Sequence, residues 1–137
     1  MPYSADWYIE NEVLYMLYSG ESTLDELRES LLTVKKFIDT SSRPLVHIIT
    51  DVSKVTIPIA PKNSLPVVRD VGSHDRLGWN VILGETSVML KIGIALGTSI
   101  FKMRTRTLDT IEEAEAFLAE KDSTLNWDQV NRSVLTH

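Results

Sequence analysis

The chain has 137 residues, of which 43% are hydrophobic, and 14 Lys and Arg against 19 Asp and Glu give a formal net charge of -5 at pH 7. This length fits one domain with an adequate core, and the acidic balance argues against a large phosphate-contacting surface, so we expect no nucleic-acid partner. The absence of cysteine excludes disulfides, thiolate nucleophiles and thiolate metal ligands. No segment resembles a signal peptide or approaches the about 20 apolar residues of a membrane span. We therefore expect a cytoplasmic protein without a cofactor.

The N-terminal third is predicted to form a hairpin followed by a long helix. Aromatic and branched residues at 7–9 and 13–18 flank a polar turn at 10–12, which is typical of two paired strands. The sequence TLDE at 23–26 has the form of a capping box, in which a Thr hydroxyl and a Glu carboxylate satisfy backbone donors at a helix start. Apolar residues then recur at helical spacing to about Ile38.

Two apolar strands and a short helix are predicted in the middle of the chain. Residues 45–49, LVHII, are apolar at nearly every position, as expected of a central strand covered on both faces. Ser64 is predicted to cap a short helix that has Pro66 in its first turn and ends near Gly72. The next strand is expected over 78–83, GWNVIL.

The segment 87–96 suits either a buried helix or a strand because it is apolar all round. Capping residues in front of it and Gly97 behind it favour a helix. Residues 100–106 then alternate apolar with basic side chains, which predicts a half-buried strand. A second capping box, TIEE at 110–113, begins the last helix.

The predicted order is therefore ββαβαβαβα, an α/β fold in a single domain over residues 1–122. It contains a mixed sheet of about five strands with four helices, in which the first strand is antiparallel and right-handed crossovers make the others parallel. Residues 123–137 form a C-terminal tail. Trp127, Val130 and Val134 have the spacing of a weak amphipathic helix, which could dock on this domain, dock on a neighbour or fray.

Two stretches of the chain resemble a known family. Residues 45–55, LVHIITDVSKV, resemble the strand and "D-L-S-x-V" exit of STAS domains (sulphate transporter and anti-sigma-factor antagonist domains). Residues 101–104, FKMR, followed by 110–118, TIEEAEAFL, resemble the ending of the SpoIIAA-like branch, which is related to lipid-binding CRAL-TRIO domains. The resemblance covers Trp7 to Asp122. It implies a SpoIIAA-like mixed sheet and a non-catalytic regulatory module that acts through protein contacts.

The family's phospho-regulated members carry a D-S-S-G motif after this exit, and its serine is the kinase target. The matching stretch here is IAPK at 59–62, so the phosphoacceptor motif is absent. The phosphorylation-driven partner switch is therefore not expected in its usual form.

The loop after the third strand is the candidate interaction or modification site, with Asp51, Ser53, Lys62 and Ser64. Asp51 ends a parallel strand, where ligand crevices form, or it accepts hydrogen bonds from the amides of Ser53 and Lys54 as a loop cap. Ser64 is the hydroxyl nearest the family's phosphorylation position. At a helix start it could carry a phosphate, or it could simply cap the helix.

A second candidate surface comes from elements that are apolar on both faces. Strand 13–18 has apolar residues on both faces, and the segment 87–96 has no clear polar face. Val88, Met89, Ile92 and Leu96 are therefore candidates for an apolar ligand site or a homodimer surface. An ordinary buried helix is the alternative.

Catalytic and metal-binding motifs are absent from the sequence. It contains no G-x-S-x-G, H-E-x-x-H, G-x-G-x-x-G or G-x-x-x-x-G-K-[ST] motif, and three histidines without cysteine argue against a structural zinc site. His74 and Asp75 could act as a base and its orienting carboxylate, whereas His47 suits a satisfied core position. The basic residues at 102, 104 and 106 suit an anion site or the protection of an edge strand.

We therefore expect a non-enzyme. The leading hypothesis is a STAS-like regulatory module that contacts a protein partner near the loop 52–64, as a homodimer. The alternative is a carrier or sensor of a small apolar or lipid-like ligand.

Overall fold

The computed structural model describes residues 3–84, 88–101 and 103–135, and it confirms the predicted order of elements. The strands are β1 (Tyr3–Ile9), β2 (Val13–Glu21), β3 (Val46–Ile57), β4 (Leu77–Leu83) and β5 (Arg104–Leu108). The helices are α1 (Leu24–Thr40), α2 (Pro61–Val71), α3 (Val88–Phe101) and α4 (Ile111–Lys121), followed by the short 3₁₀ helices η1 (Trp127–Gln129) and η2 (Arg132–Leu135). The fold is α/β, as the sequence predicts.

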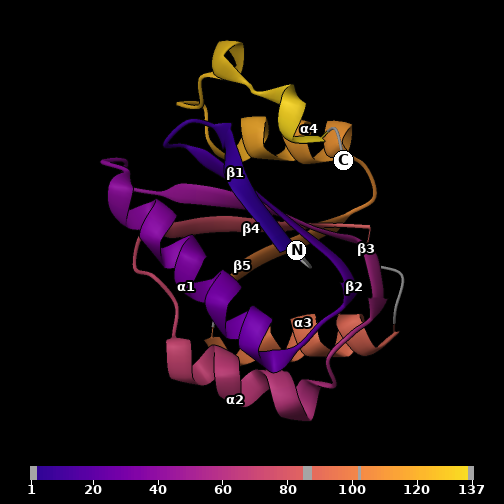
Figure 1. Ribbon diagram of the computed structural model, residues 1–137. Coiled ribbons are helices and arrows are strands. Elements are labelled where there is room, and N and C mark those ends of the chain that lie inside the picture. The colour runs from indigo at the N-terminus through magenta and orange to yellow at the C-terminus, as the bar shows by residue number, and fades with distance from the viewer. Residues whose placement is uncertain (1–2, 85–87, 102, 136–137) are drawn as a thin grey trace.

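The sheet is mixed, and its strand order follows the chain. Its order is β1-β2-β3-β4-β5, with β1 antiparallel to β2 and every later pair parallel. Right-handed crossovers that always step to the next strand return over the same face of a sheet. Helices α1, α2 and α3 accordingly lie on one side, while α4 and the C-terminal residues lie on the other (Figure 1).

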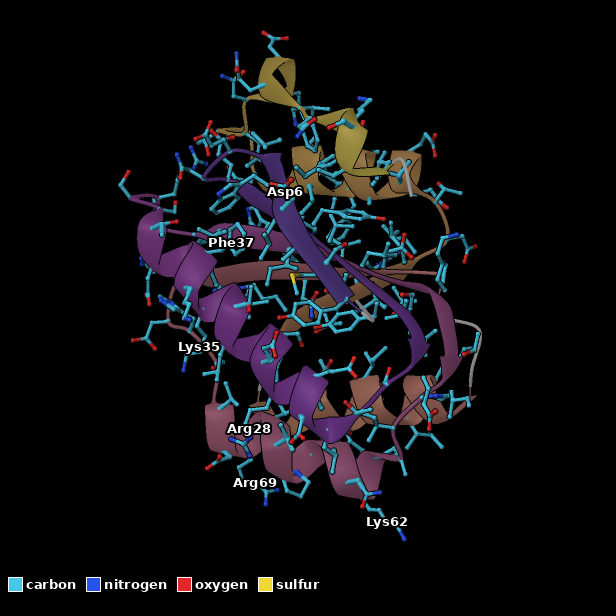
Figure 2. All side chains as sticks on the ribbon, in the orientation of Figure 1. Asp6, Arg28, Lys35, Phe37, Lys62 and Arg69 are labelled. Carbon is cyan, nitrogen blue, oxygen red and sulfur yellow. The ribbon has the colours of Figure 1, made fainter. Side chains whose placement is uncertain are left out.

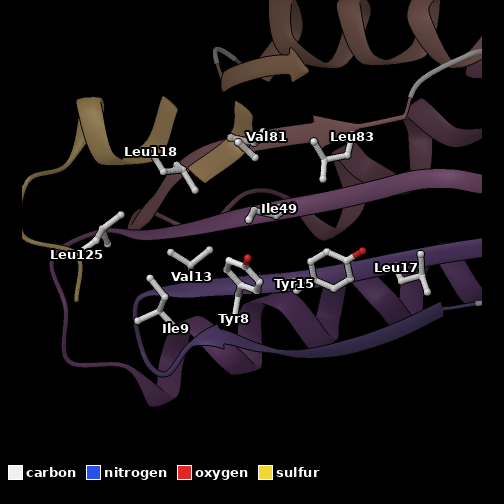
Figure 3. Close-up of a cluster of buried hydrophobic side chains, with 11 residues drawn as sticks. Tyr8, Ile9, Val13, Tyr15, Leu17, Ile49, Val81, Leu83, Leu118 and Leu125 are labelled. Atoms are coloured by element: carbon white, nitrogen blue, oxygen red, sulfur yellow. The ribbon is translucent and has the colours of Figure 1, made fainter. Parts of the chain in front are cut away.

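Strands β2 and β3 are buried on both faces. This confirms the prediction made from their apolar residues, which occupy both faces of each strand. Alternate residues face the three crossover helices or α4. The α4 side holds the larger core cluster, which includes Tyr8, Val13, Ile49 and Leu118, all of them fully buried (Figure 3). Each such side chain contributes about 1.5–3 kcal/mol relative to an exposed position.

Both predicted helix starts carry the threonine cap of a capping box, whereas each glutamate carboxylate accepts from the threonine hydroxyl rather than from its backbone N–H. Thr23 accepts a hydrogen bond from the backbone N–H of Glu26 at 3.3 Å, and Thr110 accepts one from that of Glu113 at 3.2 Å. These side-chain bonds satisfy donors that the first turn of a helix leaves free. The starts of α1 and α4 therefore agree with the sequence prediction.

The predicted start of α2 and end of α3 are wrong. Helix α2 begins at Pro61 with Ala60 as its N-cap, so Ser64 lies inside the first turn and Pro66 lies in the helix interior. Pro61 suits the first helical position because its fixed φ matches the helix and its missing N–H costs nothing there. Helix α3 continues through Gly97 to Phe101, so the following strand starts at Arg104 rather than near residue 100.

The C-terminal residues dock on their own domain, on the α4 side of the sheet. Leu125 is buried in the larger core cluster, and Trp127 packs against the same cluster. The backbone N–H of Asn131 donates to the carbonyl of Tyr8 at 2.8 Å, and Val130 forms an isolated antiparallel bridge with Ile9. Of the three alternatives that the sequence left open, the structure shows docking on the same domain.

Candidate functional site

A cavity of about 260 Å³ lies between the sheet and the three crossover helices. Its walls are formed mainly by apolar side chains from every element on that side. They are Leu27 and Leu31 of α1, Val52 and Val55 of β3, Val68 of α2, Ile82 of β4 and Ile94 of α3. An enclosed apolar cavity of roughly 150 Å³ accepts a benzene-sized molecule, so this larger and partly open one has room for a larger, mainly apolar ligand.

The sheet contributes one polar pair to the cavity. Thr50 of β3 donates a hydrogen bond to Oδ1 of Asn80 on β4 at 2.7 Å, and both side chains line the cavity. Because Oδ1 is the acceptor, the Asn80 amide nitrogen is a donor group of this wall. Asparagine is uncommon in the middle of a strand, so Asn80 is the signal in the sequence that points to a polar site here.

A smaller cavity of about 140 Å³ adjoins the first. Thr50, Asn80 and Val68 line both cavities, so the polar pair lies where the two meet. The smaller cavity is lined by Lys35 and His74 as well. The Lys35 ammonium donates to the carbonyl of Val71 at 2.8 Å, at the C-terminal end of α2, where a cation is favourable.

The tyrosines in the cavity wall already have hydrogen-bond partners. Tyr3 donates to Glu29 at 2.7 Å, and Tyr18 donates to Ser30 at 2.8 Å. Burial raises the pKa of Tyr18 to about 12, although its hydrogen bond with Ser30 lowers it slightly. Both phenols therefore act as neutral wall groups at physiological pH.

The cavity ends at the start of α1, where Glu26 contributes to the wall. Its Oε1 accepts a hydrogen bond from the Thr23 hydroxyl at 3.0 Å. Its Oε2 is buried and has no hydrogen-bond partner among the described residues.

The four candidate residues do not share a loop and are not brought together. Strand β3 continues to Ile57 and so contains Asp51 and Ser53, while Lys62 and Ser64 lie within α2. Thr50 and Val52 face the cavity, so Asp51 between them points to the α4 side. There it is buried and accepts hydrogen bonds from Tyr15 at 2.5 Å and from both the amide and the hydroxyl of Ser53. Tyr15 takes the place predicted for the Lys54 amide.

Ser64 and Lys62 lie on the other side of the sheet, on α2. Ser64 is half-buried, lines the cavity and donates to the carbonyl of Pro61 at 3.4 Å. Lys62 is exposed and projects from α2 away from the sheet (Figure 2). Asp51 and Ser64 therefore belong to different environments.

Helix α3 contributes to the cavity through a different face from the one predicted. Ile94 and Thr98 line it, whereas Ile92 and Leu96 are 50% and 42% exposed on the outside of the helix. The side chains of Val88 and Met89 lie outside the described residues.

The two internal histidines are each held by a backbone amide and a carboxylate. His74 faces Asp39 at 2.6 Å rather than the neighbouring Asp75, and its Nδ1 accepts from the amide of Arg76 at 3.0 Å. His47 is buried against Asp122 on the α4 side.

The basic residues of β5 are engaged within the domain. This strand lies at the edge of the sheet, and Arg104 donates to the carbonyl of Leu77 at 3.3 Å. Arg106 lies over the ring of Phe117 of α4, 5.6 Å from its centre, which is within the range of a cation–π contact. Lys102 lies outside the described residues.

Comparison with protein-family models and with curated proteins gave no match for this sequence. Within the described part of the chain, none of the helices has the length and apolar character needed to cross a bilayer. The same residues contain no group of three or more His, Asp or Glu side chains arranged to hold a metal ion.

Proposed function

We propose that the chain is a non-catalytic, STAS-like regulatory module that binds a small, largely apolar ligand between its sheet and helices α1, α2 and α3. The observation that carries this proposal is the cavity of about 260 Å³, apolar except for a few placed polar groups. Ligand sites generally combine apolar walls with a small number of polar groups that fix orientation. The Thr50 and Asn80 pair is such a group.

The regulatory part of the proposal rests on the end of β3 and its connection to α2. Val55, Pro58 and Ile59 line the cavity, while Lys54 and Ile57 in the same segment are exposed. A ligand that contacts the cavity-lining residues changes the conformational free energy of the whole segment, including its exposed residues. The segment 52–64, which runs from the end of β3 into the first turn of α2, would thereby report occupancy of the cavity to a protein partner.

Native mass spectrometry of protein purified from its own host tests the proposal. We expect a mass adduct that disappears on denaturation, and chemical-shift changes at Thr50, Asn80 and Ile82 when 1-octanol is titrated in. Val68→Phe, which places a larger side chain into both cavities, should remove both effects. Leu32→Phe is the matched control because Leu32 is 45% exposed and does not line the cavity.

Absence of both the adduct and the octanol shifts in wild-type protein would refute ligand binding. The same spectra report the oligomeric state. A dimer mass that is lost in Ile92→Glu would support the proposed homodimer through the exposed side of α3, since Ile92 is 50% exposed.

A further inference from the structure

The wall of the larger cavity contains one unsatisfied charged group. Glu26 is the single carboxylate among its described lining residues, and none of those residues is Lys, Arg or His. Oε2 of Glu26 is buried without a hydrogen-bond partner. A buried charged acceptor without a donor is costly, so a ligand that brings a donor to this carboxylate is stabilised by it.

Three donors of the same wall already have acceptors other than Oε2 of Glu26. The Thr23 hydroxyl donates to Oε1 of the same carboxylate, and the Tyr3 hydroxyl donates to Glu29. The Tyr18 hydroxyl donates to Ser30.

The second capping box shows that the motif itself does not require this burial. Glu113 makes the same bonds, with its Oε1 accepting from the Thr110 hydroxyl at 3.1 Å and its amide donating to that hydroxyl at 3.2 Å. Glu113 is exposed and is not part of the cavity wall. What distinguishes Glu26 is that its side chain lines the cavity and that its second oxygen is buried without a partner, not its role at the helix start.

We infer that the ligand is an apolar amine, whose ammonium group pairs with the Glu26 carboxylate while its apolar body fills the cavity. An ammonium supplies both the missing donor and the compensating charge, and such charge-assisted bonds are about twice as strong as neutral ones. An alcohol supplies the donor alone. A carboxylate, including a fatty acid, brings a like charge to a wall that offers it no cation.

This inference rests on the proposed ligand-binding function, and three probes with the same apolar chain separate the two. Binding of n-octylamine, 1-octanol and octanoate is measured by calorimetry and by amide chemical shifts at pH 7. We expect octylamine to bind about ten-fold or more tightly than octanol, and octanoate to bind weakest. Glu26→Gln should equalise octylamine and octanol, because glutamine preserves the capping box but removes the charge.

Glu113→Gln is the matched control, since it makes the same substitution in the same motif away from the cavity. It should leave the preference for the amine unchanged, and melting curves of both variants verify that they fold. Equal or tighter binding of octanol or octanoate by the wild-type protein would overturn the assignment to amines while leaving the ligand site intact. If none of the three probes binds, the proposed function fails together with this inference.

Discussion

Nε2 of His47 lies 2.8 Å from a carboxylate oxygen of Asp122, which joins the centre of the sheet to the end of α4. The other ring nitrogen, Nδ1, accepts a hydrogen bond from the backbone N–H of Trp79 at 2.9 Å. A backbone N–H can only donate, so Nε2 carries the proton and donates to Asp122. One buried ring thus connects β3, β4 and the residue that follows α4.

Replacing this ring should be costly. His47→Ala is expected to lower the free energy of unfolding by about 2–4 kcal/mol, because it leaves a cavity and removes the partners of the Trp79 amide and the Asp122 carboxylate. Urea denaturation followed by circular dichroism measures the change. His74→Ala is the matched control: its ring makes the same two kinds of bond, but its partner Asp39 is 67% exposed.

Exposed ion pairs contribute little, so His74→Ala should cost less than about 1 kcal/mol. Equal losses of unfolding free energy in the two variants would mean that burial of His47 does not determine its contribution to stability.

Acid should weaken the same contact. Burial disfavours the Asp122 carboxylate, but hydrogen bonds from Thr124 and His47 outweigh burial and lower the pKa of Asp122 from 3.8 to about 2. A folded-state pKa below the unfolded value gives stability that is fully present above about pH 4 and is lost as the pH falls through about 2. For Asp122 this amounts to roughly 2 kcal/mol at neutral pH.

Asp122→Asn should flatten the dependence of unfolding free energy on pH between about pH 5 and pH 2, since Asn does not titrate. The measurement is a series of urea curves across that range, and the comparison uses slopes rather than absolute values. A variant slope equal to that of the wild type would show that Asp122 is not the group responsible.

Gly78 leaves space for the His47 ring. A Cβ added to Gly78 would lie 2.4 Å from Nδ1 of His47, closer than any real contact. Gly78→Ala should therefore lower the free energy of unfolding by about 1–3 kcal/mol through overpacking, as measured by thermal and urea denaturation. In the His47→Ala background the same substitution should cost much less, because the clashing ring is gone.

Gly20→Ala separates this clash from backbone strain. Gly20 has a φ of 66° with nothing within 4 Å of an added Cβ, so its cost of about 1–2 kcal/mol should come from the backbone and should not depend on His47. Additive effects of Gly78→Ala and His47→Ala would contradict the proposed contact.

The elements were predictable because their signals are local. The two threonine caps, the polar turn at 10–12 and the doubly apolar strands are each contained in a short window of sequence, and all are present in the structure. The boundaries of α2 and α3 were less predictable. Ser64 and Gly97 have the residue types of helix ends, but Pro61 allows an earlier start of α2, and α3 continues through the four residues TSIF after Gly97.

The site was not predictable because it depends on distances between elements. Glu26 was recognised as a capping residue, but the burial of its second oxygen depends on where α1 lies over the sheet. Thr50 and Asn80 are 30 residues apart, and His47 and Asp122 are 75 apart. No periodicity relates such pairs, so their pairing appears only once the sheet register is known.

The docked C-terminal residues should contribute to stability as part of the core. Leu125 is 7% exposed in the cluster that also holds Ile9 and Leu118, so Leu125→Ala should cost about 2–4 kcal/mol in unfolding free energy. Leu32→Ala, at a position that is 45% exposed, should cost less than about 1 kcal/mol and controls for the loss of leucine as such. Both are measured by urea denaturation at pH 7. If Leu125→Ala proved as mild as Leu32→Ala, residues 123–135 would be an appendage of the domain rather than part of its core, since a core leucine cannot lose its side chain without leaving a void.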